Sequence, residues 1–201
     1  MGLCCEEAAR LILTRREPTR LVTVGEGALT QEEEALLALR AALISDAQAR
    51  EKGVEERMED ILARCGTALP EVSLADWAAF YLALERMDEA WTARLTALRE
   101  RADALPLQAF AAHMAARMTE YEQLLVYFLY RHLPAALDDG DAAGKAAFAV
   151  LSVRLLFALG ALHYGQNGDF TVDDQLELCR LYSAEVEYSD DNLNALFDAL
   201  M

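Results

Sequence analysis

The sequence contains little glycine and proline, the residues that most often break helices. Of its 201 residues only ten are glycine and four are proline, whereas alanine, leucine, glutamate and arginine are frequent. These frequent residues favour helices, while turns and strand-rich folds depend more on glycine and proline. The composition therefore predicts an all-α protein, and the length allows a single domain or two small ones.

Basic side chains are also scarce. The chain has 34 acidic residues against 18 basic ones, a formal charge of −16, and its only lysines are Lys52 and Lys145. Most of such a surface repels a phosphate backbone, so nucleic acid is not expected as a partner. The charge suits a substrate that presents lysines, although solvated helix faces are the simpler explanation for it.

Residues that bind metals are few and scattered. No C-x-x-C pair occurs, so local spacing supports neither a zinc ribbon nor an iron–sulfur cluster. The histidines are too far apart for a local metal triad, and no metal site is predicted. The cysteines are Cys4, Cys5, Cys65 and Cys179, and the histidines are His113, His132 and His163.

No segment is predicted to cross a membrane. The longest apolar run, 146–162, is about 17 residues long with Arg154 at its centre, whereas a spanning helix needs roughly 20 apolar residues and a central arginine is costly there. We expect a buried core helix instead. Residues 1–13 include acidic residues and lack a cleavage-like tail, so no secretory signal is expected. The protein is predicted to be cytoplasmic with reduced thiols.

Capping patterns and apolar spacing predict about eight or nine helices in an irregular bundle. Thr30 with Glu33, Ser73 with Asp76, and Thr171 before Asp173 and Asp174 mark three helix starts. The most apolar helices, 107–133 and 142–163, are expected to form a central pair. We predict one domain over 1–201, or two subdomains over 1–105 and 106–201. The expected helices cover residues 6–16, 30–51, 54–65, 73–87, 88–105, 107–133, 142–163, 171–188 and 189–200, with a short strand at 19–24.

Two patterns resemble ligand sites but lack essential residues. The stretch 21–34 runs strand, Gly-x-Gly, helix, as a dinucleotide or methyltransferase site begins. Its third glycine is missing, and no further strands are available for the parallel sheet that such a site needs. The acidic turns at 138–141 and 167–174 do not fit EF-hand calcium spacing, and helix capping explains them better.

Two groups of side chains could hold a ligand. Tyr121 and Tyr130 belong to an aromatic band whose ring faces could attract a lysine ammonium or a methyl sulfonium, and Glu122 and Arg131 add polar groups to it. Such a band more often packs in a core. Arg154 needs a carboxylate partner if it is buried, and the sequence offers Glu185, Glu187 or Asp141.

The last residues, LYSAEVEYSDDNLNALFDALM (181–201), are richer in specific polar groups than a packed helical tail requires. They resemble the closing pattern Y-S-x-x-[VI]-E-x-S-x-x-N-L of the flagellin lysine N-methylase family, with Tyr188 where histidine is usual. Three further segments are similar to the family in the same order: LCCEEAARLIL (3–13), YEQLLVYFLYRHL (121–133) and DDGDAAGKAAFAVLS (138–152).

The resemblance implies methylation of flagellin lysines, or those of another lysine-bearing protein, with S-adenosylmethionine as methyl donor. Family members are about twice this length, and their cysteine-rich first half is thought to hold an iron–sulfur centre whose ligands are absent here. A separate cysteine-rich N-terminal chain could supply that half. No residue is assigned as catalytic. The candidates for binding substrate or cofactor are Tyr121, Tyr130, Arg131, Arg154, Glu185, Tyr188 and Asn192.

Three interpretations follow. The chain is the C-terminal helical part of a lysine N-methylase that handles substrate or cofactor and is not active alone. Alternatively, it is a non-enzymatic helical module that binds a protein through its acidic surface. In the third interpretation, it is a structural domain in which the polar tail only fixes the last two helices to Arg154.

Overall fold

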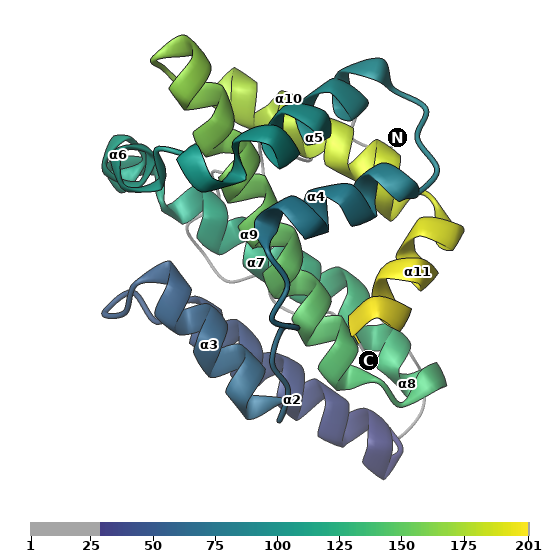
Figure 1. Ribbon diagram of the computed structural model, residues 1–201. Helices are drawn as coiled ribbons and strands as arrows, with labels where there is room; N and C mark the ends of the chain where they lie inside the picture. Colours follow the sequence, from purple (N-terminus) through teal and green to yellow (C-terminus); the bar gives the residue numbers. More distant parts are fainter. Residues whose placement is uncertain (1–28, 201) are drawn as a thin grey trace, which may run out of the picture. The chain divides into compact units, whose positions relative to one another are not determined.

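The computed structural model describes residues 29–200, and every regular element within them is a helix (Figure 1). The predicted all-α fold is confirmed. The predicted helix 6–16, the strand at 19–24, the glycine turn after it and Cys4 and Cys5 lie outside the described residues. The α-helices are α2 Gln31–Ala47, α3 Val54–Arg64, α4 Leu74–Ala83, α5 Glu89–Arg101, α6 Leu107–His113, α7 Thr119–His132, α8 Ala136–Asp139, α9 Ala142–Asn167, α10 Val172–Tyr182 and α11 Asp190–Leu200.

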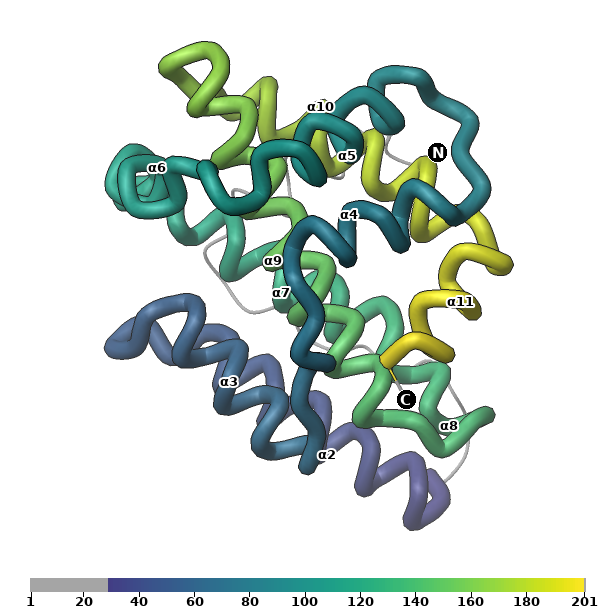
Figure 2. Tube along the Cα trace, in the orientation of Figure 1, coloured from purple at the N-terminus to yellow at the C-terminus, as the bar shows by residue number. Residues whose placement is uncertain are grey.

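The chain forms two compact units, each assembled from two separate stretches of sequence. Within the described residues, unit 1 comprises 29–68 and 119–149, and unit 2 comprises 69–118 and 150–200. The trace in Figure 2 can be followed through α9, whose first residues belong to unit 1 and whose remainder belongs to unit 2. These boundaries differ from the predicted alternative of two subdomains divided at residue 105. The other alternative, a single domain over 1–201, stays a prediction.

The helix starts read from the sequence are confirmed. Thr30 accepts a hydrogen bond from the Glu33 amide, and the Glu33 carboxylate accepts one from the Thr30 amide, which completes a capping box. Ser73 accepts from the Asp76 amide at the start of α4. Thr171 begins α10 with a second reciprocal box. Each motif satisfies amides that the first helical turn leaves without intrahelical acceptors.

Three helices end earlier than predicted. The first was expected to reach residue 51, but α2 ends at Ala47, and Gly53 precedes α3 as its N-cap. Arg57 donates to the Ala47 carbonyl and takes the place of a further helical turn. Likewise α4 ends at Ala83 rather than 87, and α5 ends at Arg101 rather than 105, with a 3₁₀ turn following it. The helix predicted over 171–188 is present as α10 and a π-helix that continues it to Glu187.

The predicted single helix over 107–133 is wrong. α6 ends at His113, a 3₁₀ turn follows at Ala115–Arg117, and α7 begins at Thr119. No proline or glycine marks this break. The side chain of Arg117 donates to the carbonyl of Phe170, so a contact distant in sequence holds the interrupted backbone. The expected central pair of continuous helices is therefore replaced by α7 and α9 with α6 as a separate element.

Unit 1 is built on α2, which packs against α3, α7 and α8. Phe128 of α7 and Phe148 of α9 meet edge to face, and His132 packs against Phe148. In unit 2, α4 packs against α5. Side chains fully enclosed in these cores include Leu43, Ile61, Leu125, Phe128 and Phe148 in unit 1, and Tyr81, Trp91, Leu95, Phe110, Phe170 and Tyr182 in unit 2.

The long helix α9 is long and apolar enough to cross a membrane, with a mean hydropathy of 1.8 in its most apolar window. However, 83% of that window is buried inside the protein. Among the described residues it is the one helix with this length and composition. This burial agrees with the core helix that the sequence predicted for 146–162.

Candidate functional site

The polar tail contains a short π-helix, Ser183–Glu187, between α10 and α11. Its wider turn closes with the amide of Tyr188 donating to the carbonyl of Ser183 at 3.0 Å. The hydroxyl of Ser183 donates to the Glu187 carboxylate at 2.9 Å, which spans the same turn. Single π-turns inside α-helices occur frequently at functional sites. The family-like tail thus coincides with the one π-turn in the described residues.

Glu185 joins this π-helix to the loop before α5. Its side chain is 3% exposed, and its two carboxylate oxygens accept from the amides of Met87 and Asp88, both at 2.9 Å. These amides lie at the start of α5, where a negative charge also interacts favourably with the helix dipole. Both carboxylate oxygens therefore accept hydrogen bonds from the backbone. Glu185 was considered as a partner for Arg154, but its carboxylate stabilises the start of α5 instead.

Asn192 makes the second connection between the same segments. Its amide oxygen accepts from the Glu85 amide at 3.0 Å, and its nitrogen donates to the carbonyls of Glu85 and Glu185 at 2.9 and 2.7 Å. The residue is 3% exposed. One side-chain amide thus satisfies three buried or half-buried backbone groups, which makes it specific for this geometry.

Tyr182 anchors the tail in the core of unit 2. Its hydroxyl lies 2.7 Å from that of Ser152 on α9, and its ring packs edge to face against Trp91. Burial raises the pKa of Tyr182 well above its usual value, and the charge of nearby Tyr81 would raise it further. Burial likewise raises the pKa of Tyr81. Both phenols therefore stay protonated, and neither can act as a general base near neutral pH.

The joined segments present a surface of mixed apolar and acidic character. Met87 is 77% exposed and Tyr188 is 69% exposed, values that are high for large apolar side chains. The exposed acids on the same segments are Glu85, Glu89, Asp190 and Asp191, and Arg86 is an exposed base among them. An aromatic face with carboxylates on the same segments can attract an ammonium group. We call the exposed side chains of 85–89 and 188–191 the tail surface.

A family model for the FliB lysine N-methylase C-terminal domain matches residues 33–201. The chain belongs to this family. The matched region contains the π-helix, Asn192 and the tail surface, whereas the family-like segment at 3–13 lies outside the match. Searches of curated proteins and of solved structures returned no match.

The predicted site residues of this FliB-family chain do not form one cluster within either unit. Glu185 and Asn192 are directly bonded in unit 2, and Tyr188 follows them on the tail surface. Arg154, half-buried on α9, belongs to unit 2 as well. The other three lie in unit 1: Tyr121 is fully buried, Arg131 is exposed, and Tyr130 has its ring covered by the guanidinium of Arg40 at 4.9 Å from the centroid.

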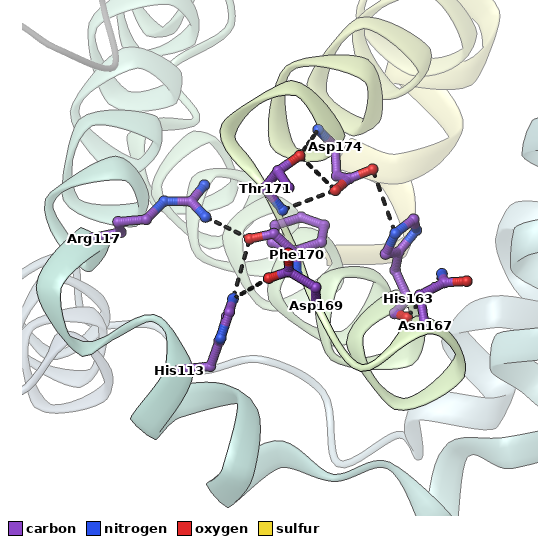
Figure 3. Close-up of polar contacts among 8 residues, drawn as sticks. All are labelled: His113, Arg117, His163, Asn167, Asp169, Phe170, Thr171 and Asp174. Carbon is purple, nitrogen blue, oxygen red and sulfur yellow. Dashed lines mark hydrogen bonds and ion pairs between the residues drawn. The ribbon is translucent and has the colours of Figure 1, made fainter.

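A polar group around the 167–171 turn was not foreseen from the sequence (Figure 3). The Phe170 carbonyl accepts from Arg117, and His113 Nε2 lies 3.1 Å from the same oxygen and 3.4 Å from the Asp169 carboxylate. The turn itself was recognisable as GQNGD. Its partners are more than fifty residues away, so no local signal reveals them.

The start of α10 carries the second half of this group. The Asp174 carboxylate accepts from the amide and hydroxyl of Thr171 at 2.8 and 2.6 Å, and His163 Nε2 lies 3.4 Å away (Figure 3). Partial burial alone would raise the pKa of Asp174. The Thr171 hydrogen bonds and the nearby His163 and Arg94 outweigh it and hold that pKa below its usual range. The geometry is that of a helix cap.

The buried acid of the 121–133 segment also has a structural role. Glu122 is 3% exposed and accepts from Arg57 at 3.0 Å and from Arg50 at 3.1 Å. Arg57, 7% exposed, also donates to the carbonyls of Ala47 and Lys52. Because the buried Glu122 carboxylate is paired with the buried Arg57, the ion pair joins α3 and α7 inside unit 1, and the more exposed Arg50 adds a second contact.

The described residues do not fit a metal cluster. No group of three or more His, Cys, Asp or Glu side chains within 29–200 is arranged to hold a metal ion. Cys65 and Cys179 are the cysteines in this range, and burial raises the pKa of Cys65, which disfavours the thiolate that binds iron. An iron–sulfur centre therefore finds no ligand set among these residues.

Proposed function

We propose that this chain is the substrate-recognition part of a lysine N-methylase and that it holds a lysine-bearing segment of flagellin or a similar protein at its tail surface. The observation that carries the proposal is the double connection made by Glu185 and Asn192. These side chains are fully used in fixing two segments to each other, and the fixed segments expose Met87, Tyr188, four acids and one base, Arg86. Such rigidity reduces the ordering cost of binding.

The charge of the chain supports a basic partner. With a net charge of −16 and two lysines, it attracts lysine-rich segments over a range limited by salt. The exposed tyrosine gives an ammonium a more specific contact than charge alone, since a ring face attracts cations within about 6 Å of its centroid. Recognition at the tail surface would therefore be weakened by salt and by removal of Tyr188.

S-adenosylmethionine supplies the methyl group in the reaction that the family resemblance implies. The predicted candidates on this chain offer it little. Tyr121 is enclosed, Glu185 and Asn192 are committed to backbone, and one face of the Tyr130 ring is covered by Arg40. We therefore propose that the methyl donor and the iron–sulfur centre are held by a separate cysteine-rich part of the enzyme, in the cytoplasm, and that this chain alone does not catalyse methylation.

The test is binding of the purified chain to monomeric flagellin, measured with native flagellin and with flagellin whose lysines have been acetylated. Acetylation removes the positive charge, so binding should fall at least tenfold. The variants Y188A and M87A should weaken binding similarly. Matched controls are L107A and V172A, which truncate other exposed apolar side chains of unit 2 and should leave binding unchanged.

Three results would contradict the proposal. Equal binding of native and acetylated flagellin would show that the lysine charge plays no part in recognition. Tight binding of S-adenosylmethionine to the chain alone, measured by calorimetry, would place the cofactor here and make the chain more than a recognition part. Flagellin binding that survives Y188A and M87A but still depends on lysine charge would favour a diffuse acidic surface, as in the non-enzymatic module.

A further inference from the structure

A pocket of about 180 Å³ lies within unit 1, and none of its lining residues belongs to the tail surface. Its lining comes from α2 and from the segment around α8. Most of the lining is apolar: Leu29, Leu36, Leu37, Pro134 and Leu137, with Glu33 and Arg40 as the polar members. The volume exceeds that of a single water, about 30 Å³ in the liquid, and suits a short organic group.

Arg40 is the unusual member of this lining. Only 7% of the residue is exposed, and its Nε atom is enclosed without a hydrogen-bond acceptor. Within residues 29–200 no carboxylate is paired with it, and its guanidinium lies over the Tyr130 ring, 4.9 Å from the ring centroid. A buried cation without a carboxylate costs stability, because the lost hydration is not replaced.

Arg57 shows how the same unit treats an arginine that has only a structural role. It has the same exposure, 7%, yet it donates to two backbone carbonyls and to Glu122. Glu33, the acidic residue of the lining, accepts a hydrogen bond from the Thr30 amide at 2.7 Å as part of the capping box. The pocket thus places an incompletely bonded cation beside apolar walls. This arrangement is complementary to a ligand that has an anionic group and an apolar body.

We propose that this pocket binds a small carboxylate carried on a short aliphatic chain. The carboxylate would receive hydrogen bonds from the Arg40 guanidinium, whose planar donors match its two oxygens. The aliphatic part would contact the leucine and proline side chains. The chain's overall negative charge repels such ligands in general, so binding depends on this local cation rather than on long-range attraction.

The experiment is a titration of the full chain with hexanoate, followed by NMR of the Leu36 and Leu137 methyl groups and by calorimetry. Hexan-1-ol and hexylamine have the same apolar body without the carboxylate. Hexanoate should bind at least tenfold more tightly than either, and the methyl shifts should appear at the pocket. Occupancy of the pocket by another part of the chain would prevent these shifts and would overturn the proposal.

Variants separate the charge of Arg40 from its packing. R40M should abolish the preference for hexanoate over hexan-1-ol, while R50Q, which removes an exposed arginine of the same unit, should keep it. R40Q repeats the test with a polar side chain if R40M folds poorly. Saturating hexanoate should raise the Tm of the wild type and of R50Q but not that of R40M or R40Q. Equal binding by wild type and both Arg40 variants would contradict the proposal.

Discussion

Asn192 is the residue on which the tail depends most, because its side chain serves three backbone groups in two segments. We predict that N192A lowers the free energy of unfolding by about 2 to 4 kcal/mol, since each net hydrogen bond contributes about 1 kcal/mol and unsatisfied buried groups add a further cost. Chemical denaturation measures the change. N194A, on the exposed side of the same helix, should alter stability by less than about 0.5 kcal/mol. Similar losses in both variants would mean that helix propensity, not bonding, matters here.

In unit 1 the ion pair between Arg57 and Glu122 has the stabilising role that Asn192 has in unit 2. R57M should destabilise the protein by about 3 to 5 kcal/mol, because it leaves a buried carboxylate with only the partly exposed Arg50. The double variant R57M/E122L should recover much of this loss, since no unpaired charge then remains buried. Denaturant midpoints of the two variants test the point. A double variant less stable than R57M alone would show that packing outweighs charge.

At the scale of an element, the cap of α10 predicts an acid-sensitive contribution to stability. The pKa of Asp174 is lowered from its usual 3.8, so its carboxylate stabilises the fold fully above that pH. The stabilisation is lost as the pH falls through the lower folded-state value. D174N should lower the free energy of unfolding by about 1 kcal/mol near neutral pH. Below about pH 3.8 the difference in stability between D174N and the wild type should become smaller. Melting curves from neutral to acidic pH test this, and a constant difference would contradict it.

Helix starts and helix ends differed in how well the sequence predicted them. The starts at Thr30, Ser73 and Thr171 depend on a side chain and an amide three residues apart, so the signal is local. The ends depend on distant partners. Arg57 caps α2 through Ala47, and Arg117 holds the break after α6 through Phe170; neither acceptor can be identified from a side-chain pattern.

The candidate site was predictable in the same limited way. Glu185 and Asn192 were recognised as more specific than packing requires, and the family match includes them. Their partners were not foreseen, because backbone amides at Met87 and Asp88 leave no sequence signal. For the tyrosine band of 121–130, the sequence analysis considered both a ligand site and packing in the core. Tyr121 is enclosed and Tyr130 contacts Arg40, and their role in binding stays a prediction.

At the scale of the whole molecule, the net charge of −16 predicts that salt stabilises the fold. Repulsion among surface acids favours the expanded chain, and ions screen it. Raising sodium chloride from about 0.02 M to about 0.5 M should add roughly 1 kcal/mol, or about 2 to 4 °C in Tm. Potassium chloride at the same concentrations should raise the Tm by the same amount, because screening depends on ionic strength. A falling Tm would mean that the attractive pairs outweigh the repulsion.

The division of each unit between two stretches also matters while the chain is being synthesised. The first stretch of unit 1 is complete at residue 68, but its second stretch ends at 149, after the ribosome has already made the first stretch of unit 2. That stretch, residues 69–118, must in turn wait for α10 and α11. Apolar faces of both units are therefore exposed together during translation, a period in which aggregation competes with folding. A premature stop before α10 would leave unit 2 without the segment that fixes the start of α5, so such a product should be a substrate for chaperones and proteases.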